Sequence, residues 1–218
     1  SDKIAAKAEV AKIIGSRHII PILWEGTNPE DVPFDKLIPP YIIKVNHSSG
    51  NNYFVFNKEE IDREKIIKSL RINLTSAHDH ILREEGYRNI PRKILIEPVV
   101  TTFKGDMPFD YKFFVYHGRV HFIQVDYNRF NNEAESYSFY NRDWEELPFS
   151  ISNVPQLSHM VPKPANLREM FEIAEKIGSL FDFVRVDLYN APTGIFFGEA
   201  TFYPAGGTDV FNPVLWDY

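Results

Sequence analysis

Hydrophobic and polar residues alternate with two different periods along this 218-residue chain, and together they predict an α+β fold. Apolar residues at steps of three and four predict helices over residues 59–85 and from Leu167 onward. A capping Ser1-Asp2 pair and a terminating Gly15 predict another helix over residues 3–14. Alternation with a period of two predicts strands at residues 18–24, 41–46, 53–56, 89–100, 110–116, 120–126, 183–189 and 194–202.

The last helix carries the clearest local signals. Asn166, with Glu169 three residues later, matches a capping box that begins a helix. An apolar stripe with helical spacing follows, and such a stripe is more often core than a cofactor site. The stripe consists of Leu167, Met170, Phe171, Ala174, Ile177 and Phe181. We therefore expect this helix to support the strand that follows it.

Charged residues are concentrated in the hairpin predicted over residues 183–202. Arg185 and Asp187 share one face of its first strand, and Glu199 and Thr201 share one face of its second. An isolated Arg-x-Asp pair is usually a salt-bridged sheet surface. Here apolar residues flank every charge, which indicates a partly buried face. Two carboxylates on such a face resist ionisation unless a cation lies between them, and oxygen ligands of this kind suit Mg²⁺.

The sequence of this hairpin resembles a known family. Arg-Val-Asp, then Gly-Glu-x-Thr and Tyr-Pro-Ala-Gly, is similar to the metal-binding hairpin of ATP-grasp ligases, and the surrounding sequence resembles the TupA-like ATP-grasp family. The resemblance implies that Arg185 contacts the transferring phosphoryl group and that Asp187 and Glu199 hold two magnesium ions. Thr201 stands where these ligases have Asn, and its hydroxyl is implied to ligate Mg²⁺ or one of its waters.

Two earlier stretches resemble the phosphate-binding part of the same family. The opening Asp-Lys-x-x-x-Lys is similar to its entry point, which assigns Lys3 to the ATP phosphates; the ordinary interpretation is that Lys3 and Lys7 are solvated. Ser-Ser-Gly alone is only a turn. Within YIIKVNHSSG it resembles the ATP-grasp strand and lid, which implies that Lys44 contacts phosphate. The implied lid residues are His47, Ser48, Ser49 and Gly50.

The adenosine contacts are also implied by the resemblance. Glu97, which precedes Pro98 at a strand end, is assigned to a position beside the adenine, although a Glu before Pro is often only an edge feature. The backbone of Val99 and Val100 is assigned to the edge of the base. Asp110 occupies the place where ATP-grasp ligases bind the ribose hydroxyls with an acidic residue.

Three cations in the second half are candidates for the reacting groups. Lys112 resembles the Asp-Tyr-Lys-Phe element of the TupA-like family and is assigned to the cleft as a catalytic residue. A strand Lys ordinarily serves solubility, but Lys112 lies between apolar neighbours. Arg129 and Arg142 are candidates for acceptor or phosphate contacts, and the sequence does not rank them.

The resemblance implies two lobes of mostly antiparallel sheet backed by helices, with ATP held between them. The N-terminal lobe is expected over residues 1–97 and the C-terminal lobe, with the metals, over residues 98–218. The implied activity is an ATP-dependent carboxylate–amine ligase that proceeds through an acyl phosphate. Its expected substrates are an amino acid or other amine and a uronic-acid carboxylate of a cell-surface glycan, as in teichuronopeptide and capsule synthesis. Association with polysaccharide synthesis machinery is also expected.

Two other functions stay open: a kinase that phosphorylates a hydroxyl in the same cleft, and a nucleotide-binding module without turnover.

Composition excludes several kinds of site and partner. The chain has no Cys, which excludes disulfides and thiolate chemistry, and its formal charge of −6 argues against a nucleic-acid partner. No apolar run is long enough to span a membrane, so a cytoplasmic protein is expected. The resemblance also implies further residues before Ser1 that help to bind the acceptor.

Overall fold

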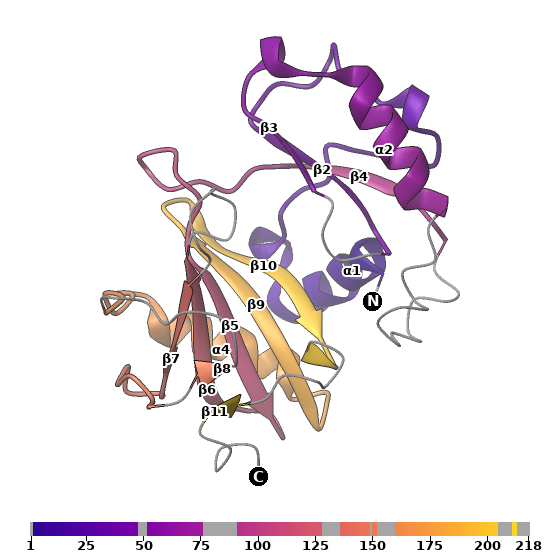
Figure 1. Cartoon of the computed structure of the whole chain (residues 1–218). Coiled ribbons are helices and arrows are strands. Elements are labelled where there is room, and N and C mark those ends of the chain that lie inside the picture. Colours follow the sequence, from indigo (N-terminus) through magenta and orange to yellow (C-terminus); the bar gives the residue numbers. More distant parts are fainter. Residues whose placement is uncertain are drawn as a thin grey trace. The chain divides into compact units, whose positions relative to one another are not determined.

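A computed structural model describes residues 2–47, 52–75, 91–127, 136–148, 150–151, 160–204 and 211–212. Its α-helices are α1 Lys3–Ile14, α2 Arg63–Thr75 and α4 Leu167–Gly178, with 3₁₀ turns at Ser16–His18, Pro29–Asp31 and Lys58–Glu60. The strands pair into antiparallel sheets, which confirms the predicted α+β class (Figure 1). The chain divides into two compact units, one formed by Ser1–Ala8 and Ile20–Val99 and the other by Glu9–Ile19 and Val100–Tyr218. The domain boundary placed between residues 97 and 98 stays a prediction.

Unit 1 contains a four-stranded antiparallel sheet with the strand order β1-β4-β2-β3. Its strands are β1 Trp24–Gly26, β2 Tyr41–Val45, β3 Tyr53–Val55 and β4 Ile94–Pro98. Alternate residues of β2 are buried in one apolar cluster with Leu70 of α2, as a half-buried strand requires. Lys44 lies on the other face of β2, which turns away from this core.

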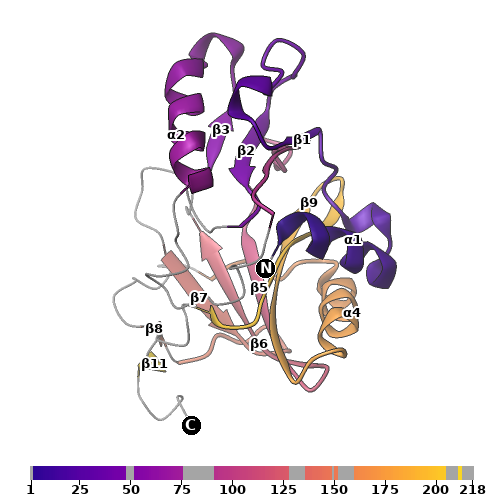
Figure 2. The ribbon, with the colours of Figure 1, turned by 90° about the vertical axis from the view of Figure 1, so that its right-hand side faces the viewer.

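Unit 2 contains a five-stranded antiparallel sheet with the strand order β10-β9-β5-β6-β7. Its strands are β5 Asp110–Tyr116, β6 Arg119–Tyr127, β7 Ser136–Tyr140, β9 Phe183–Ala191 and β10 Gly194–Thr201. A separate two-stranded pair joins β8 Ser150–Ile151 to β11 Phe211–Asn212. Helix α4 lies along one face of the large sheet (Figure 2), and its stripe from Leu167 to Ile177 is buried against that face as predicted. Phe181, also predicted in the stripe, follows the end of α4 and is 38% exposed. The opposite face carries charged residues and a smaller aromatic cluster.

Several elements differ from the prediction, and the strand expected over residues 89–100 is β4 Ile94–Pro98. Residues 18–24 are not one strand: residues Ser16–His18 form a 3₁₀ turn and only Trp24 belongs to β1. The His18 Nδ1–H donates to the Ile195 carbonyl at 2.8 Å, which holds this turn against β10 within unit 2. The long helix begins at Arg63 rather than residue 59, because the Asp62 carboxylate accepts a hydrogen bond from the Lys65 N–H at 3.0 Å and caps it. Residues 76–90, where that helix was expected to continue, lie outside the described residues.

The predicted capping box at Asn166 is also wrong. Asn166 precedes α4, but its side chain makes no hydrogen bond to the helix backbone. It exchanges two hydrogen bonds of 2.8 Å with the amide of Asn190 instead. Glu169 lies 3.5 Å from the Arg17 guanidinium. The two side chains have the spacing of a capping box, but both bind residues elsewhere in the chain instead of the helix backbone.

None of the helices in the described part of the chain has the length and apolar character needed to cross a bilayer.

Candidate active site

Charged side chains form rows across the open face of the large sheet. Strand pairing places Glu199, Asp187, Lys112 and Gln124 opposite one another on β10, β9, β5 and β6. The next row contains Thr201 beside Arg185, and the row on the other side contains Asp110 beside Asp126. Because paired residues of adjacent strands point to the same face, these groups converge on one patch of the sheet. We call this patch the charged face.

A β-bulge sets which residues of β10 reach the charged face. Phe197 pairs with Leu188, and the register then shifts so that Glu199, not Gly198, pairs with Asp187. Without this extra residue, Glu199 would pair with Val186 and point toward the apolar core. Gly198 suits the bulge, because a Cβ there would lie 3.0 Å from the Tyr189 ring and 3.2 Å from the Asp187 carbonyl.

Replacement of Gly198 by Ala should therefore disturb the hairpin. The added methyl group must displace the Tyr189 ring or the β9 backbone, and overpacking of this kind costs about 1–3 kcal/mol. Urea denaturation followed by fluorescence measures the free energy of unfolding. An unchanged midpoint would show that the bulge tolerates a side chain and does not fix Glu199.

Arg185 is the cation held most firmly on this face. Its Nε and Nη2 donate to the two carboxylate oxygens of Asp187, each at 2.8 Å, and Nη2 also donates to the Thr201 hydroxyl at 3.2 Å. A bidentate pair of this kind fixes the plane of the guanidinium. Both carboxylate oxygens of Asp187 keep further lone pairs, so the pair does not prevent Asp187 from binding a metal ion.

The pKa values on this face follow from burial. Burial raises the pKa of Asp187 to about 6, against the opposing effect of Arg185, and Asp110 raises it further. Burial alone would lower the pKa of Arg185, but Asp187 outweighs it and the pKa lies above its ordinary value. The contact with Arg185 therefore opposes the cost of burying the Asp187 charge.

Lys112 lies among acidic groups in the centre of the face. Its ammonium contacts the Asp126 carboxylate directly and lies 4.0 Å from Asp110, and all three residues are buried. Gln124 donates to the other oxygen of Asp126 at 2.6 Å. Asp126 and Gln124 were not predicted as site residues. They lie two positions apart in β6, so the period-two alternation of this strand could have placed both on the same face as Lys112.

The charged face carries more negative than positive charge. Four carboxylates, Asp110, Asp126, Asp187 and Glu199, share it with two cations, Lys112 and Arg185, which leaves two negative charges when all are ionised. Within the described ranges, no three His, Cys, Asp or Glu side chains are grouped so as to hold a metal by themselves. Magnesium fits such a site, because it commonly takes one or two carboxylates and completes its shell with water and phosphate oxygens. Asp187 and Glu199 would be its protein ligands.

A second charged cluster lies within unit 1. Glu97 is buried on β4, with one oxygen 2.8 Å from the Lys7 ammonium and the other 2.5 Å from the Lys44 ammonium. Lys7 also donates to the Ile20 carbonyl at 3.0 Å. Lys7 was expected to be solvated, but it is buried because Glu97 and Ile20 supply partners from distant parts of the chain. We call these three side chains the lysine–glutamate cluster.

The lysine–glutamate cluster retains one net positive charge. Burial acts to raise the pKa of Glu97, but Lys44 and Lys7 outweigh it and hold that pKa below its ordinary value. Burial lowers the pKa of Lys7 despite the attraction of Glu97. Lys44 is the more exposed of the two lysines, so it is the one able to meet an anion such as a phosphate.

The other residues assigned to the phosphates lie near the end of β2. The Lys3 N–H donates to the Asn46 carbonyl at 3.2 Å, and the Asn46 amide donates to Asp2 at 3.1 Å. These contacts tie the start of α1 to β2 within unit 1. His47 is buried beside Asn46, whereas Ser48, Ser49 and Gly50 lie outside the described residues. Phosphate contacts by Lys3 and His47 stay predictions.

The residues assigned to adenosine are placed as follows. Both oxygens of Glu97 contact lysines, so its place beside the adenine stays a prediction. The Val99 N–H donates to the Pro40 carbonyl at 3.2 Å, and contacts of the Val99 and Val100 backbone with the base stay predictions. Asp110 is buried next to Lys112, and its contact with ribose is likewise untested.

Arg142 has a structural position. Its guanidinium pairs with Glu175 of α4, donates to the Val120 carbonyl at 3.0 Å and lies 4.5 Å from the centre of the Phe171 ring. These partners belong to the α4 side of the sheet, opposite the charged face. Arg129, the other candidate for acceptor contacts, lies outside the described residues.

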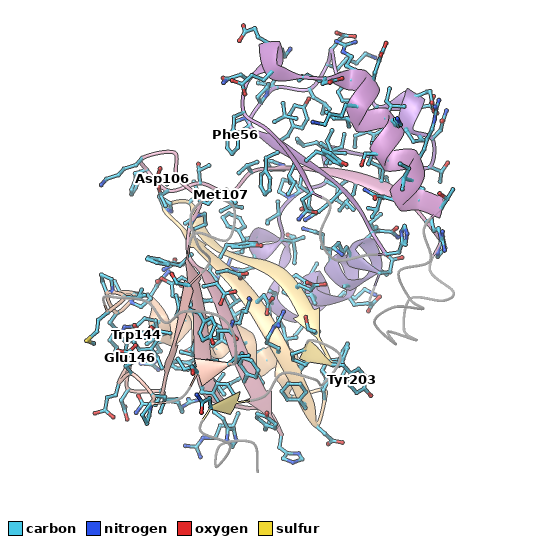
Figure 3. All side chains as sticks on the ribbon, viewed as in Figure 1. Phe56, Asp106, Met107, Trp144, Glu146 and Tyr203 are labelled. Carbon is cyan, nitrogen blue, oxygen red and sulfur yellow. The ribbon has the colours of Figure 1, made fainter. Side chains whose placement is uncertain are left out.

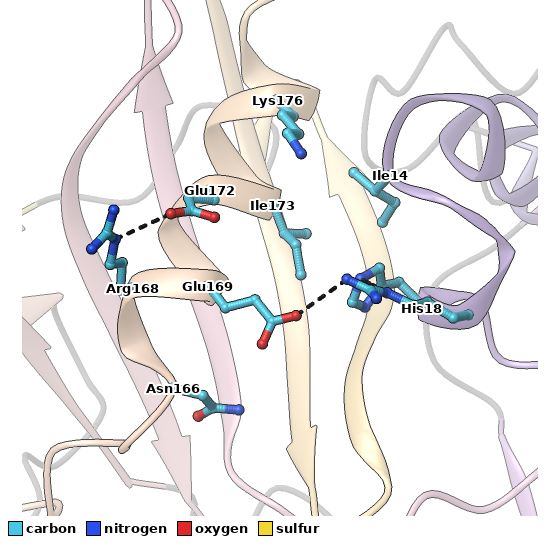
Figure 4. A pocket seen from close by; sticks show the side chains of 9 residues that line it. Ile14, His18, Asn166, Arg168, Glu169, Glu172, Ile173 and Lys176 are labelled. Atoms are coloured by element: carbon cyan, nitrogen blue, oxygen red, sulfur yellow. Dashed lines mark hydrogen bonds and ion pairs between the residues drawn. The ribbon is translucent and has the colours of Figure 1, made fainter.

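A pocket of about 410 Å³ lies on the α4 side of unit 2 (Figure 4). Ile14, His18 and Asn166 contribute to its lining, together with charged residues of α4. Its arginines are paired, Arg17 with Glu169 at 3.5 Å and Arg168 with Glu172 at 3.2 Å. No predicted site residue lines this pocket, so it does not compete with the charged face.

Solved structures with a similar fold include ligases. The D-alanine–D-alanine ligase of Bacillus anthracis aligns with a TM-score of 0.53 and 16% identity over 92% of this chain and 56% of its own. Its structure in complex with ATP aligns with a TM-score of 0.51 and 15% identity over 92% and 54%. Phosphoribosylamine–glycine ligase of Thermotoga maritima gives a TM-score of 0.53 and 15% identity over 92% and 47%. The chain thus spans about half the length of these proteins.

No curated protein sequence matches this chain. The sequence profile described as TupA-like ATPgrasp, however, matches residues 1–218, the whole chain. The similar structures carry the ATP-grasp fold, which agrees with the paired antiparallel sheets and helices described above. The chain therefore has the ATP-grasp fold and belongs to the TupA-like ATP-grasp family.

Proposed function

We propose that this chain is the nucleotide- and metal-binding part of an ATP-dependent carboxylate–amine ligase. The observation that carries the proposal is the charged face, where Asp187 and Glu199 lie opposite each other beside a fixed Arg185. Like charges opposite each other in neighbouring strands are unfavourable, so the pair favours a bound cation. Family membership and the fold of known ligases support the same activity.

Each charged group has a role in this proposal. Bound Mg²⁺ at Asp187 and Glu199 would neutralise the β- and γ-phosphates. Arg185 stabilises negative charge on the transferring phosphoryl group, and its bidentate bond to Asp187 keeps it in place. Lys112, oriented by Asp126, supplies a second cation to the reacting groups. Thr201 orients Arg185 through its hydroxyl and is a further candidate for a metal-bound water.

Unit 1 supplies the phosphate contacts. Lys44 binds phosphate oxygens, since the lysine–glutamate cluster carries one net positive charge and Lys44 is its more exposed lysine. Lys3 and the residues of the 47–50 lid complete the phosphate contacts. The backbone at Val99 and Val100 binds the adenine, and Asp110 binds the ribose.

The proposed reaction has two group transfers. An oxygen of the acceptor carboxylate bonds to the γ-phosphorus, the bond from that phosphorus to the bridging oxygen breaks, and ADP leaves with the electron pair. The amine nitrogen then bonds to the acyl carbon, inorganic phosphate leaves, and the nitrogen loses a proton to give an amide. The acceptor is a uronic-acid carboxylate of a cell-surface glycan and the amine is an amino acid.

A screen of amines against carboxylates tests this proposal. The chain is incubated with Mg²⁺-ATP, each uronic acid and each amino acid, and ADP release is measured. We expect ADP only when both substrates are present. ADP release with no need for an amine, together with a stable phosphate ester, would indicate a kinase. No ADP release across the panel would favour a binding module.

Replacement of Lys44 by Met should weaken ATP binding and leave the fold intact. A hydrogen bond to a charged group contributes about 1.5–3 kcal/mol, so the affinity should fall roughly tenfold to hundredfold. Lys7 still compensates Glu97 in this variant, which limits the loss of stability. Calorimetric titration with Mg²⁺-ATP measures the change. Lys93→Met, which removes an exposed lysine 3.1 Å from Glu25, is the matched control; equal affinity in both variants would exclude Lys44 from the site.

A further inference from the structure

An aromatic pocket of about 730 Å³ lies at one end of the large sheet. Phe181 follows α4, Phe183 begins β9, and Phe202 and Tyr203 follow β10; Tyr203 is labelled in Figure 3. The rings of Phe181 and Phe202 meet edge to face with their centres 4.9 Å apart. Tyr203 is 76% exposed. Several large apolar side chains are thus held open to solvent in one concave place, which marks an interaction site rather than scattered surface residues.

The rim of this pocket is polar. The Asp182 carboxylate lies 3.7 Å from His117 Nδ1, and the His117 N–H donates to the Asp182 carbonyl at 2.8 Å, which joins two turns at the rim. Among the described residues that line the pocket, none is Lys or Arg. An anionic membrane surface requires basic residues at such a rim. The combination of apolar rings with a carboxylate and an imidazole instead suits a ligand that has both CH faces and hydroxyl groups.

One residue of the pocket, Phe183, lies on the same side of the sheet as the charged face. Phe183 lies two residues before Arg185 in β9, so both side chains point to the same side of that strand. Phe183 packs against the cluster of Phe114 on this side of the sheet. Phe202 directly follows Thr201, so by the same alternation its side chain turns away from the charged face, and its ring meets Phe181 instead. Phe183, two residues before Arg185, is therefore the part of the lining that connects the pocket with the charged face.

We propose that this pocket binds a pyranose ring of the acceptor glycan, with the sugar stacked on Tyr203, Phe181 and Phe202 and its hydroxyls at Asp182 and His117. The identification of the sugar as part of the acceptor rests on the proposed function. Binding of the sugar itself requires neither ATP nor an amine. The volume, of the size that holds small ligands, accommodates more than one sugar ring. The ring places the rest of the glycan, with its carboxylate, toward Arg185.

Saturation-transfer NMR with methyl β-D-glucuronide and methyl β-D-glucoside, without ATP, tests this site. Wild-type chain should bind both sugars, because the stacked ring and not the carboxylate is recognised. Tyr203→Ala and Phe181→Ala should each weaken binding about three- to tenfold, the usual effect of an aromatic contact. Tyr203→Phe keeps the ring and should retain binding. Phe103→Ala removes a ring that is 92% exposed outside the pocket and should change nothing.

Other results would overturn the site. Failure of the wild-type chain to bind either sugar, or equal binding by Tyr203→Ala and wild type, excludes a sugar subsite here. Binding to phosphatidylglycerol vesicles that depends on Tyr203, with no sugar binding, would assign the pocket to a membrane instead. The thermal midpoint of each variant shows whether it is folded. Sugar binding without ATP turnover would support the sugar site and contradict the ligase proposal. Turnover without sugar binding would support the ligase proposal and exclude the sugar site.

Discussion

Replacement of Glu199 by Gln is expected to lower turnover by about 10²- to 10³-fold and to change ATP affinity only a few-fold. The amide keeps the size of the side chain and one acceptor oxygen, but it loses the charge that would hold Mg²⁺ against the transferring phosphate. Lys44 and the adenine contacts still hold the nucleotide. The loss should therefore fall on the transfer step, where a missing electrostatic contact typically costs about 2.7–4 kcal/mol.

The measurement is steady-state ADP release with the substrates found by the screen, together with a calorimetric ATP titration. Glu172→Gln is the matched control, because Glu172 pairs with Arg168 on the exposed side of α4. If Asp187 shares the same metal ion, Asp187→Asn should do similar damage, and the double variant should lose far less than the sum of both effects. Near wild-type turnover in Glu199→Gln would make this carboxylate part of an ordinary charged sheet surface.

The hairpin of β9 and β10 was predictable to a large extent. Alternation along each strand placed Arg185 with Asp187, and Glu199 with Thr201. Strand pairing joins the two sets, with Glu199 opposite Asp187 and Thr201 opposite Arg185. Alternation alone does not fix how the two strands align. The bulge between Phe197 and Glu199 decides that Glu199 meets Asp187, and it depends on the close approach of Tyr189 and the β9 backbone to Gly198.

The lysine–glutamate cluster could not be predicted from the sequence, because its members are far apart along the chain. Lys7 lies on a helix between Ala6 and Ala8, and a helical lysine is usually solvated. Its partner Glu97 is ninety residues further along the chain, so no local pattern joins them. The contact of Asp126 with Lys112 has the same origin, since it follows from the pairing of β5 with β6. Long-range partners of charged groups were the main part of the site that the sequence did not predict.

Replacement of Glu97 by Gln is expected to lower the free energy of unfolding of unit 1 by about 3–5 kcal/mol at pH 7, the usual cost of leaving a buried charge without its partner. Lys7 is buried and, among the described residues, would keep the Ile20 carbonyl as a hydrogen-bond acceptor, while Lys44 would lie near it with the same charge. Hydrogen exchange of the β2 and β4 amides reports on this unit. Glu25→Gln, which removes an exposed partner of Lys93, should cost less than about 1 kcal/mol.

The loss of unfolding free energy in Glu97→Gln should depend on pH, whereas a loss caused by a packing defect would not. The pKa of Glu97 lies below its ordinary value of 4.5, so the stability that its charge contributes is present above that value and is lost as the pH falls through the lowered pKa. The pKa of Lys7 already lies below 10.5, and loss of Glu97 lowers it further. As the pH rises toward 10.5, the variant sheds that proton and recovers stability. The difference between the two proteins should therefore be largest between these limits and shrink on both sides, and a difference that stays constant with pH would mean that Glu97 acts through packing rather than charge.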